Sequence, residues 1–334
     1  MASATRVKVI TWSGLTRTLA LFLVIALSSC AHKTPLEPAP SWAYPTNPPQ
    51  QGAPPTLPAG KLHLEGTKAA FTWPELKNLF DAPDWHPEDH PALPDVVAHG
   101  RRPEVRACAY CHLPTGNGRP ENARLAGLPY NYFVAQMKGF RDGKRTSSVG
   151  GRAPTQNMTL TAKAIQDDEI AAAAKYFSAL PPQTFVKVVE SSTLPKASVT
   201  AWLFKFDEKA GTEELGQRII EGPEDFERFE MRDPAAKFLA YVPMGSIARG
   251  KELAENWGFR RSLECASCHG PGYKGKDDVP GIAGRSPTSI VRQLYDFKSG
   301  ARRSGQSSEM DKVVDFMTNA DMLALAAYLA SLTP

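Results

Sequence analysis

The sequence predicts a mainly α-helical protein in which one module occurs twice, with a longer joining segment that carries short β elements. A Cys-x-x-Cys-His motif occurs at Cys108–His112 and again at Cys265–His269. The 157-residue offset between these motifs superposes many further residues, which indicates an internal repeat. Apolar residues at helical spacing in both copies favour helices over strands.

The alignment of the two copies extends well beyond the motifs. It places Arg145 on Arg302, and after a five-residue length difference it places Met158 on Met310. Segments with helical periodicity are residues 131–140, 167–180, 289–297 and 320–332. We expect each module to contain a helix, the motif, a loop, a second helix, a loop with the methionine and a final helix.

The first 29 residues have the pattern of a secretory signal. Three basic side chains precede an apolar run at residues 19–27, which is too short for a comfortable membrane span. Residues 27–30 resemble a bacterial lipobox, which implies a lipoprotein signal peptide over residues 1–29 and a lipid anchor on Cys30. The resemblance implies that the protein lies on the periplasmic side of the cell envelope. In well-studied envelopes, an aspartate after the lipidated cysteine retains a lipoprotein at the inner membrane. Ala31 stands at this position instead, so the outer membrane is weakly preferred. The alternative is a plain signal peptide with an incidental cysteine.

The remaining chain divides into four parts. Residues 30–60 are rich in proline and predict an extended tether. Residues 61–181 hold the first module with an N-terminal extension, residues 182–245 join the modules, and residues 246–334 form the second module. Alternating and β-branched stretches predict one or two short strands in the joining part. The net charge of +4, with no basic aromatic patch, excludes nucleic acid as an expected partner.

The Cys-x-x-Cys-His motif is typical of covalent haem attachment. On a helix its three side chains share one face, so that two thiols can add to the haem vinyl groups while the imidazole reaches the iron. The sequence therefore predicts two covalently bound haem c groups. The expected attachment residues are Cys108, Cys111, Cys265 and Cys268, and the expected proximal ligands are His112 and His269.

A second axial ligand lets the iron transfer electrons without binding small molecules, and a methionine thioether raises the potential. The repeat selects Met158 and Met310 as the distal ligands, because the competing Met137 aligns with Leu294, which cannot bind iron. Further methionines are more often gap-fillers than ligands. In the second module these are Met317 and Met322.

Four histidines could instead give the first haem two imidazole ligands. They are His63, His86, His90 and His99. An isolated histidine is more often exposed or hydrogen-bonded than bound to a metal, so we favour that interpretation for all four.

The order of elements resembles the small class I cytochromes c, most closely the cytochrome c4-like dihaem proteins, over residues 95–181 and 246–334. The resemblance implies a protein without catalytic residues that transfers electrons between a donor dehydrogenase or carrier and a terminal acceptor. Two six-coordinate irons would leave no position for a substrate. The alternatives are a dihaem enzyme of the peroxidase or thiosulfate dehydrogenase type, and a cytochrome subunit of a dehydrogenase complex.

Overall fold

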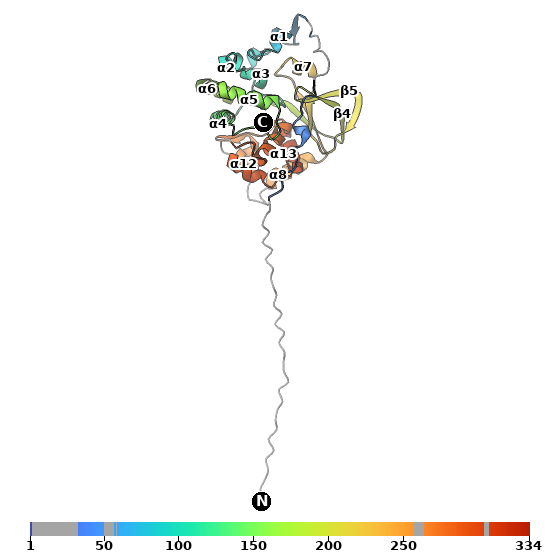
Figure 1. Ribbon diagram of the computed structural model, residues 1–334. Helices are drawn as coiled ribbons and strands as arrows, with labels where there is room; N and C mark the ends of the chain where they lie inside the picture. Colours follow the sequence, from blue (N-terminus) through green and yellow to red (C-terminus); the bar gives the residue numbers. More distant parts are fainter. Residues whose placement is uncertain (2–32, 50–56, 58, 257–263, 304–306) are drawn as a thin grey trace. The chain divides into compact units, whose positions relative to one another are not determined.

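The computed structural model describes residue 1 and residues 33–49, 57, 59–256, 264–303 and 307–334 (Figure 1). The predicted signal peptide and Cys30 lie outside these residues. Residues 33–334 form one unit, which contains both modules and the segment that joins them. The described chain is mainly α-helical with short strands, as the sequence predicts.

The first module is a group of helices around its own apolar core. Its helices are α2 (Asp95–Ala98), α3 (Cys108–His112), α4 (Tyr130–Arg141), α5 (Ala153–Ala164) and α6 (Asp167–Ala179). Phe133 of α4 stacks on Phe177 of α6, with ring centroids 6.1 Å apart. α6 begins with a capping box, in which Glu169 accepts a hydrogen bond from the backbone N–H of Gln166. The motif helix α3 is thereby held beside two longer helices that share one core.

The second module repeats this order. Its helices are α8 (Ser246–Asn256), α10 (Cys265–His269), α11 (Pro287–Lys298), α12 (Ser307–Val314) and α13 (Asn319–Ser331). α8 crosses α13 very closely at Gly250, where an added Cβ would lie 1.9 Å from the carbonyl oxygen of Ala324. Only glycine allows the two backbones to approach so closely.

The structure corrects the expected position of the two matched methionines. Met158 lies within α5 and Met310 lies within α12, so both occupy helices rather than loops. Pro154 stands in the first turn of α5, where proline needs no hydrogen-bond partner and its fixed φ suits a helix. Pro154 therefore marks the start of a helix in the part of the chain where we expected a loop.

The joining segment contains more β structure than the one or two strands that we expected. Its elements are β3 (Val186–Glu190), β4 (Thr193–Thr200), β5 (Leu203–Glu214), β6 (Ile220–Pro223), α7 (Phe226–Glu230) and β7 (Phe238–Val242). β7 pairs in parallel with β3 and antiparallel with β6, while β4 and β5 form a separate hairpin, visible in yellow in Figure 1. The acidic run in this segment hid β6 and α7, because its charges interrupt the apolar alternation that indicates strands.

The N-terminal extension packs against this joining segment. It contains β1 (Lys61–His63), β2 (Ala70–Thr72) and α1 (Trp73–Leu76). The fully buried Trp85 and Leu76 share a small core with Met231, and the indole N–H of Trp85 donates a 2.8 Å hydrogen bond to the carbonyl of Met231. The two parts of the chain that have no counterpart in the repeat thus stabilise one another.

Residues 33–49 differ from the extended tether that their prolines predict, because they pack on the second module. The backbone N–H of Thr34 donates to Asp315, and the hydroxyl of Tyr295 donates to the carbonyl of Glu37. The Tyr44 side chain is 3% exposed. The buried Tyr44 and the half-buried Trp42 provide large aromatic surfaces that anchor this proline-rich segment on the second module.

The two modules meet at equivalent residues. Arg145 and Arg302 face each other in an antiparallel bridge. The backbone N–H of Thr146 donates a 2.8 Å hydrogen bond to Ala301, and the equivalent bond in the opposite direction measures 2.7 Å. Because each side offers the same residues to the other, the junction has the symmetry of a two-fold axis.

The side chains continue this symmetry. Arg145 donates to Gln136 (2.8 Å) and to Gln293 (3.1 Å), and Arg302 donates to Gln293 (2.7 Å) and to Gln136 (3.0 Å). Each glutamine oxygen therefore accepts from both guanidinium groups. The repeat predicted that these residues are equivalent, but not that they touch.

Within the described residues, no single helix is long and apolar enough to cross a membrane. α12 and α13 meet the length and composition required only as a pair, which is bent by 114° at its break.

Candidate haem-binding sites

The first motif opens into a cavity of about 310 Å³, within the size range of cofactor sites. Cys108, Cys111 and His112 line one side of it. Met158 from α5 and Met137 from α4 also line the cavity. The fold thus brings together the attachment, proximal and distal candidates of the first module, which lie up to 50 residues apart in the chain.

Both motif histidines are oriented in the same way. The Nδ1 atom of His112 lies 2.7 Å from the carbonyl oxygen of Ala123, and that of His269 lies 2.8 Å from the carbonyl oxygen of Pro280. A carbonyl oxygen only accepts, so Nδ1 carries the proton and Nε2 keeps its lone pair for a metal. The two carbonyl residues are equivalent in the repeat, and each follows its histidine by 11 residues.

Burial keeps these imidazoles neutral. It lowers the pKa of His112 to about 4, although the hydrogen bond to Ala123 acts in the opposite direction. Burial likewise lowers the pKa of His269. The neutral imidazole is the form that binds a metal ion, so both side chains are prepared to serve as ligands.

The four motif cysteines are unpaired thiols in the part of the chain that the structure describes. Burial raises the pKa of Cys108 to about 12 and that of Cys265 to about 11. These two thiols are therefore protonated and remain available for thioether formation.

The methionine candidates differ in their surroundings. Met158 and Met310 are half-buried, whereas Met317 and Met322 are almost fully enclosed in the core of the second module. Met137 is also buried, at 7% exposure, although it lines the first cavity. Met158 and Met310 as iron ligands therefore stay a prediction, now with Met137 as the defined competitor in the first module.

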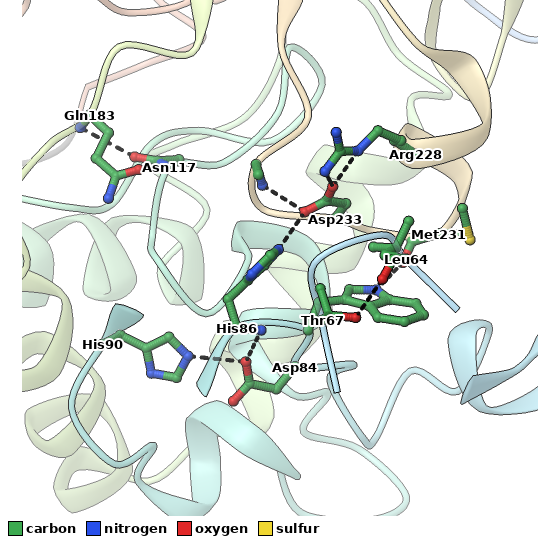
Figure 2. A network of polar contacts seen from close by, with 12 residues as sticks. Leu64, Thr67, Asp84, His86, His90, Asn117, Gln183, Arg228, Met231 and Asp233 are labelled. Atoms are coloured by element: carbon green, nitrogen blue, oxygen red, sulfur yellow. Dashed lines mark hydrogen bonds and ion pairs between the residues drawn. The ribbon is translucent and has the colours of Figure 1, made fainter. Parts of the chain in front are cut away.

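None of the four competing histidines is among the residues that line this cavity. His86 lies 3.2 Å from Asp233, His90 lies 3.1 Å from Asp84 and His99 lies 2.9 Å from Asp81. Figure 2 shows the first two of these contacts. His63 is exposed on β1. The described contacts agree with the hydrogen-bonded or exposed roles that we favoured.

The charges of the cavity fit a haem. Its lining includes more cations than carboxylates: Lys77, Arg106, Arg119 and Arg232 against Glu121 and Glu230. The buried Nη1 atom of Arg106 has no hydrogen-bond partner. A buried N–H group without an acceptor is costly, and the two propionates of a haem are suitable anionic acceptors. The donor set and the surplus of positive charge therefore match the group that the motif attaches.

Some lining residues were missed by the sequence reasoning. Leu79 comes from the N-terminal extension, and Ala201, Trp202, Glu230 and Arg232 come from the joining segment. The repeat could not indicate them, because these segments have no counterpart in the other module.

Bound haem supplies an iron that gains and loses one electron. Cys108, Cys111 and His112 in the first module, and Cys265, Cys268 and His269 in the second, would hold this group, and a backbone carbonyl would orient each imidazole. Two copies of this arrangement define a dihaem c-type cytochrome.

Comparison with known proteins agrees with this class. The family model for cytochrome c matches residues 247–333. The cytochrome subunit of sulfide dehydrogenase from Chlorobaculum tepidum is 34% identical over 83 residues, which cover 25% of this chain and 73% of that protein. The thiosulfate dehydrogenase electron acceptor from Thiomonas intermedia is 27% identical over 234 residues, or 69% of this chain and 80% of that protein. Cytochrome c4 from Pseudomonas aeruginosa is 24% identical over 234 residues, or 69% of this chain and 85% of that protein.

The chain belongs to the cytochrome c family and is a dihaem class I c-type cytochrome that is similar to the cytochromes c4. It binds two haem c groups covalently and functions in electron transfer.

Proposed function

We propose that this cytochrome is an electron carrier that accepts electrons from a dehydrogenase on the periplasmic side of a bacterial membrane and passes them to a terminal redox protein. Thiosulfate dehydrogenase is the first donor to test, because relatives that are 27% and 23% identical are named as its electron acceptors. A dehydrogenase that releases electrons singly or in pairs suits a carrier with two one-electron centres.

The direct junction between the two modules is the observation that carries this proposal. Arg145 and Arg302 join the modules without any intervening domain. Each module also presents a motif histidine with a free Nε2 atom and a matched methionine. Two similar modules in direct contact, each with its own candidate haem site, favour a relay over a reaction at one open iron.

Electron transfer from the donor can be followed directly. Oxidised holoprotein is mixed with a catalytic amount of thiosulfate dehydrogenase and with thiosulfate, and haem reduction is recorded optically. We expect full reduction of both haems at a rate that rises with the dehydrogenase concentration. No reduction with this donor would exclude it and would direct the search to sulfide and other periplasmic dehydrogenases.

The control distinguishes a carrier from an enzyme. Thiosulfate alone, without dehydrogenase, is expected to leave both haems oxidised, because two six-coordinate irons offer no substrate position. Rapid reduction by thiosulfate alone contradicts the carrier and identifies an enzyme.

The location is proposed from the sequence pattern. We place the protein on the periplasmic side with a lipid on Cys30, preferentially at the outer membrane, because residues 27–30 resemble a lipobox and Ala31 follows the cysteine. Cells that express the protein with Cys30→Ser are expected to release it into the soluble periplasmic fraction, whereas the unchanged protein sediments with membranes. Equal solubility of both forms contradicts the anchor.

A further inference from the structure

Arg232, in the joining segment, contacts the first motif helix. It follows the short helix α7 and has a φ of 59°, in the left-handed region that arginine seldom occupies. Its Nη1 atom donates a 2.7 Å hydrogen bond to the carbonyl of Tyr110, and its Nε atom donates a 3.2 Å bond to the carbonyl of Leu76. The guanidinium carbon also lies 3.5 Å from the centre of the Tyr110 ring.

The turn that carries Arg232 is fixed on both sides. Met231 accepts the hydrogen bond from Trp85 and lies in the core of the N-terminal extension. Asp233, which is buried, accepts a 2.7 Å hydrogen bond from Arg228 and contacts His86 (Figure 2). A residue held in an unfavourable backbone region between such anchors indicates a functional constraint on its position.

The contact between Arg232 and Tyr110 lies beside the cysteines that are expected to attach the first haem. Tyr110 stands between the two attachment cysteines, Cys108 and Cys111, and Arg232 lines the same cavity as all three residues. Arg232 thus joins the motif helix, the N-terminal extension and the joining segment at the wall of the first haem site.

We propose that Arg232 is a positioning residue for the first haem, which holds the motif helix α3 in place and raises the reduction potential of that haem relative to the second. The oxidised iron carries one more positive charge than the reduced iron, so a fixed cation in the wall of the haem site favours the reduced state. The proposal depends on the bound haem and not on the identity of the donor.

Among the residues that the structure describes, no arginine makes the equivalent contact with the motif helix of the second module. The residue that aligns with Tyr110 is Ser267, which is exposed, as is the neighbouring Cys268. Tyr110 is only 5% exposed. The joining segment therefore makes the two haem sites unequal, although the modules are copies.

A redox titration of the holoprotein tests this inference. Replacement Arg232→Gln removes the charge but keeps a polar side chain of similar length. We expect the oxidation equilibrium of the first haem to shift about tenfold toward the oxidised state, which is about 59 mV for a one-electron couple. The midpoint of the second haem should stay within the error of the titration. Met158→Ala, which changes the first site only, assigns the two midpoints.

Two further variants separate charge from structure. Arg232→Lys keeps the positive charge, so it should recover most of the potential that Arg232→Gln loses. A lysine ammonium cannot reproduce the two hydrogen bonds by which the guanidinium joins the carbonyl groups of Tyr110 and Leu76. Arg218→Gln removes the same charge at a position of the joining segment that is not among the residues lining the cavity, and it should leave both midpoints unchanged. An unchanged first midpoint in folded Arg232→Gln, or equal shifts of both haems, would overturn the proposal.

Discussion

The hydroxyl of Tyr44 donates a 3.0 Å hydrogen bond to the Oδ1 atom of Asp296, which lies 252 residues further along the chain. Asp296 also accepts from the backbone and the hydroxyl of Ser148. One carboxylate therefore joins the N-terminal segment, the first module and the second module.

Tyr44→Ala is expected to lower the free energy of unfolding by about 3–5 kcal/mol, because it removes a buried aromatic ring and leaves a cavity. Tyr44→Phe removes only the hydroxyl and should cost about 1 kcal/mol. Denaturant unfolding of the holoprotein measures both values. Tyr130→Ala, at a side chain that is 44% exposed, should change stability by less than about 0.5 kcal/mol. A cost at Tyr44 no larger than at Tyr130 would show that residues 33–49 do not pack on the second module in solution.

The distal ligands can be identified by spin state. Met158→Ala and Met310→Ala should each convert one haem of the oxidised protein from low spin to high spin, because the sixth ligand is lost. Met137→Leu keeps the volume of the side chain and should leave both haems low-spin. Electron paramagnetic resonance distinguishes these states. A high-spin haem in Met137→Leu, with Met158→Ala unchanged, would make Met137 the ligand.

The buried carboxyl of Glu221 predicts a pH dependence of stability. Burial raises its pKa above the ordinary value of 4.5, although hydrogen bonds from Thr288 and Ser286 act in the opposite direction. The folded protein therefore retains this proton at a pH where the unfolded chain has lost it. The stabilisation from this group is complete below pH 4.5 and is lost as the pH rises through the folded pKa.

Glu221→Gln removes this titration and keeps an oxygen that can accept from Ser286 and Thr288. We expect the variant to gain stability relative to the unchanged protein as the pH is raised from 5 to 8. Thermal midpoints at several pH values measure the difference between the two proteins. A difference that is constant with pH would show that the carboxyl does not titrate in this range.

The glutamines at the module junction should contribute strongly to stability. Gln136 accepts from the buried Arg302 and the half-buried Arg145, so Gln136→Ala removes an acceptor shared by two charged donors. We expect a loss of about 2–4 kcal/mol in the free energy of unfolding. Lys138→Ala, on the exposed face of the same helix, should cost less than about 0.5 kcal/mol. Equal effects at both positions would contradict the network.

The helices that the sequence predicted best are those with a continuous apolar face. α6 and α13 lie within one residue of the expected ends at residues 167–180 and 320–332. The α5 helix was missed because its mixed polar and small side chains give no apolar stripe, and its proline resembles a loop signal. The periodicity of apolar residues indicates a helix that buries one continuous face. It does not indicate a helix that is stabilised mainly by contacts with neighbouring elements.

The sequence predicted those residues of the candidate site that belong to the motif or have a counterpart in the other module. Cys108 and His112 follow from the motif, and Met158 was selected by alignment with Met310. Arg232 and Trp202 reach the first cavity only through tertiary contacts of a segment that occurs once. The sequence pattern of the joining segment does not indicate which residue, more than 100 positions away, each of its side chains will contact.

The bridge between Arg145 and Arg302 has the geometry of an isologous dimer contact, in which one patch binds its own copy. In a dimer of separate chains, such a contact weakens as the protein is diluted. Here both copies belong to one polypeptide, so their pairing is a unimolecular event with a fixed stoichiometry of one to one. The two redox centres therefore remain partners at any concentration of the protein, even where a single molecule meets its donor alone.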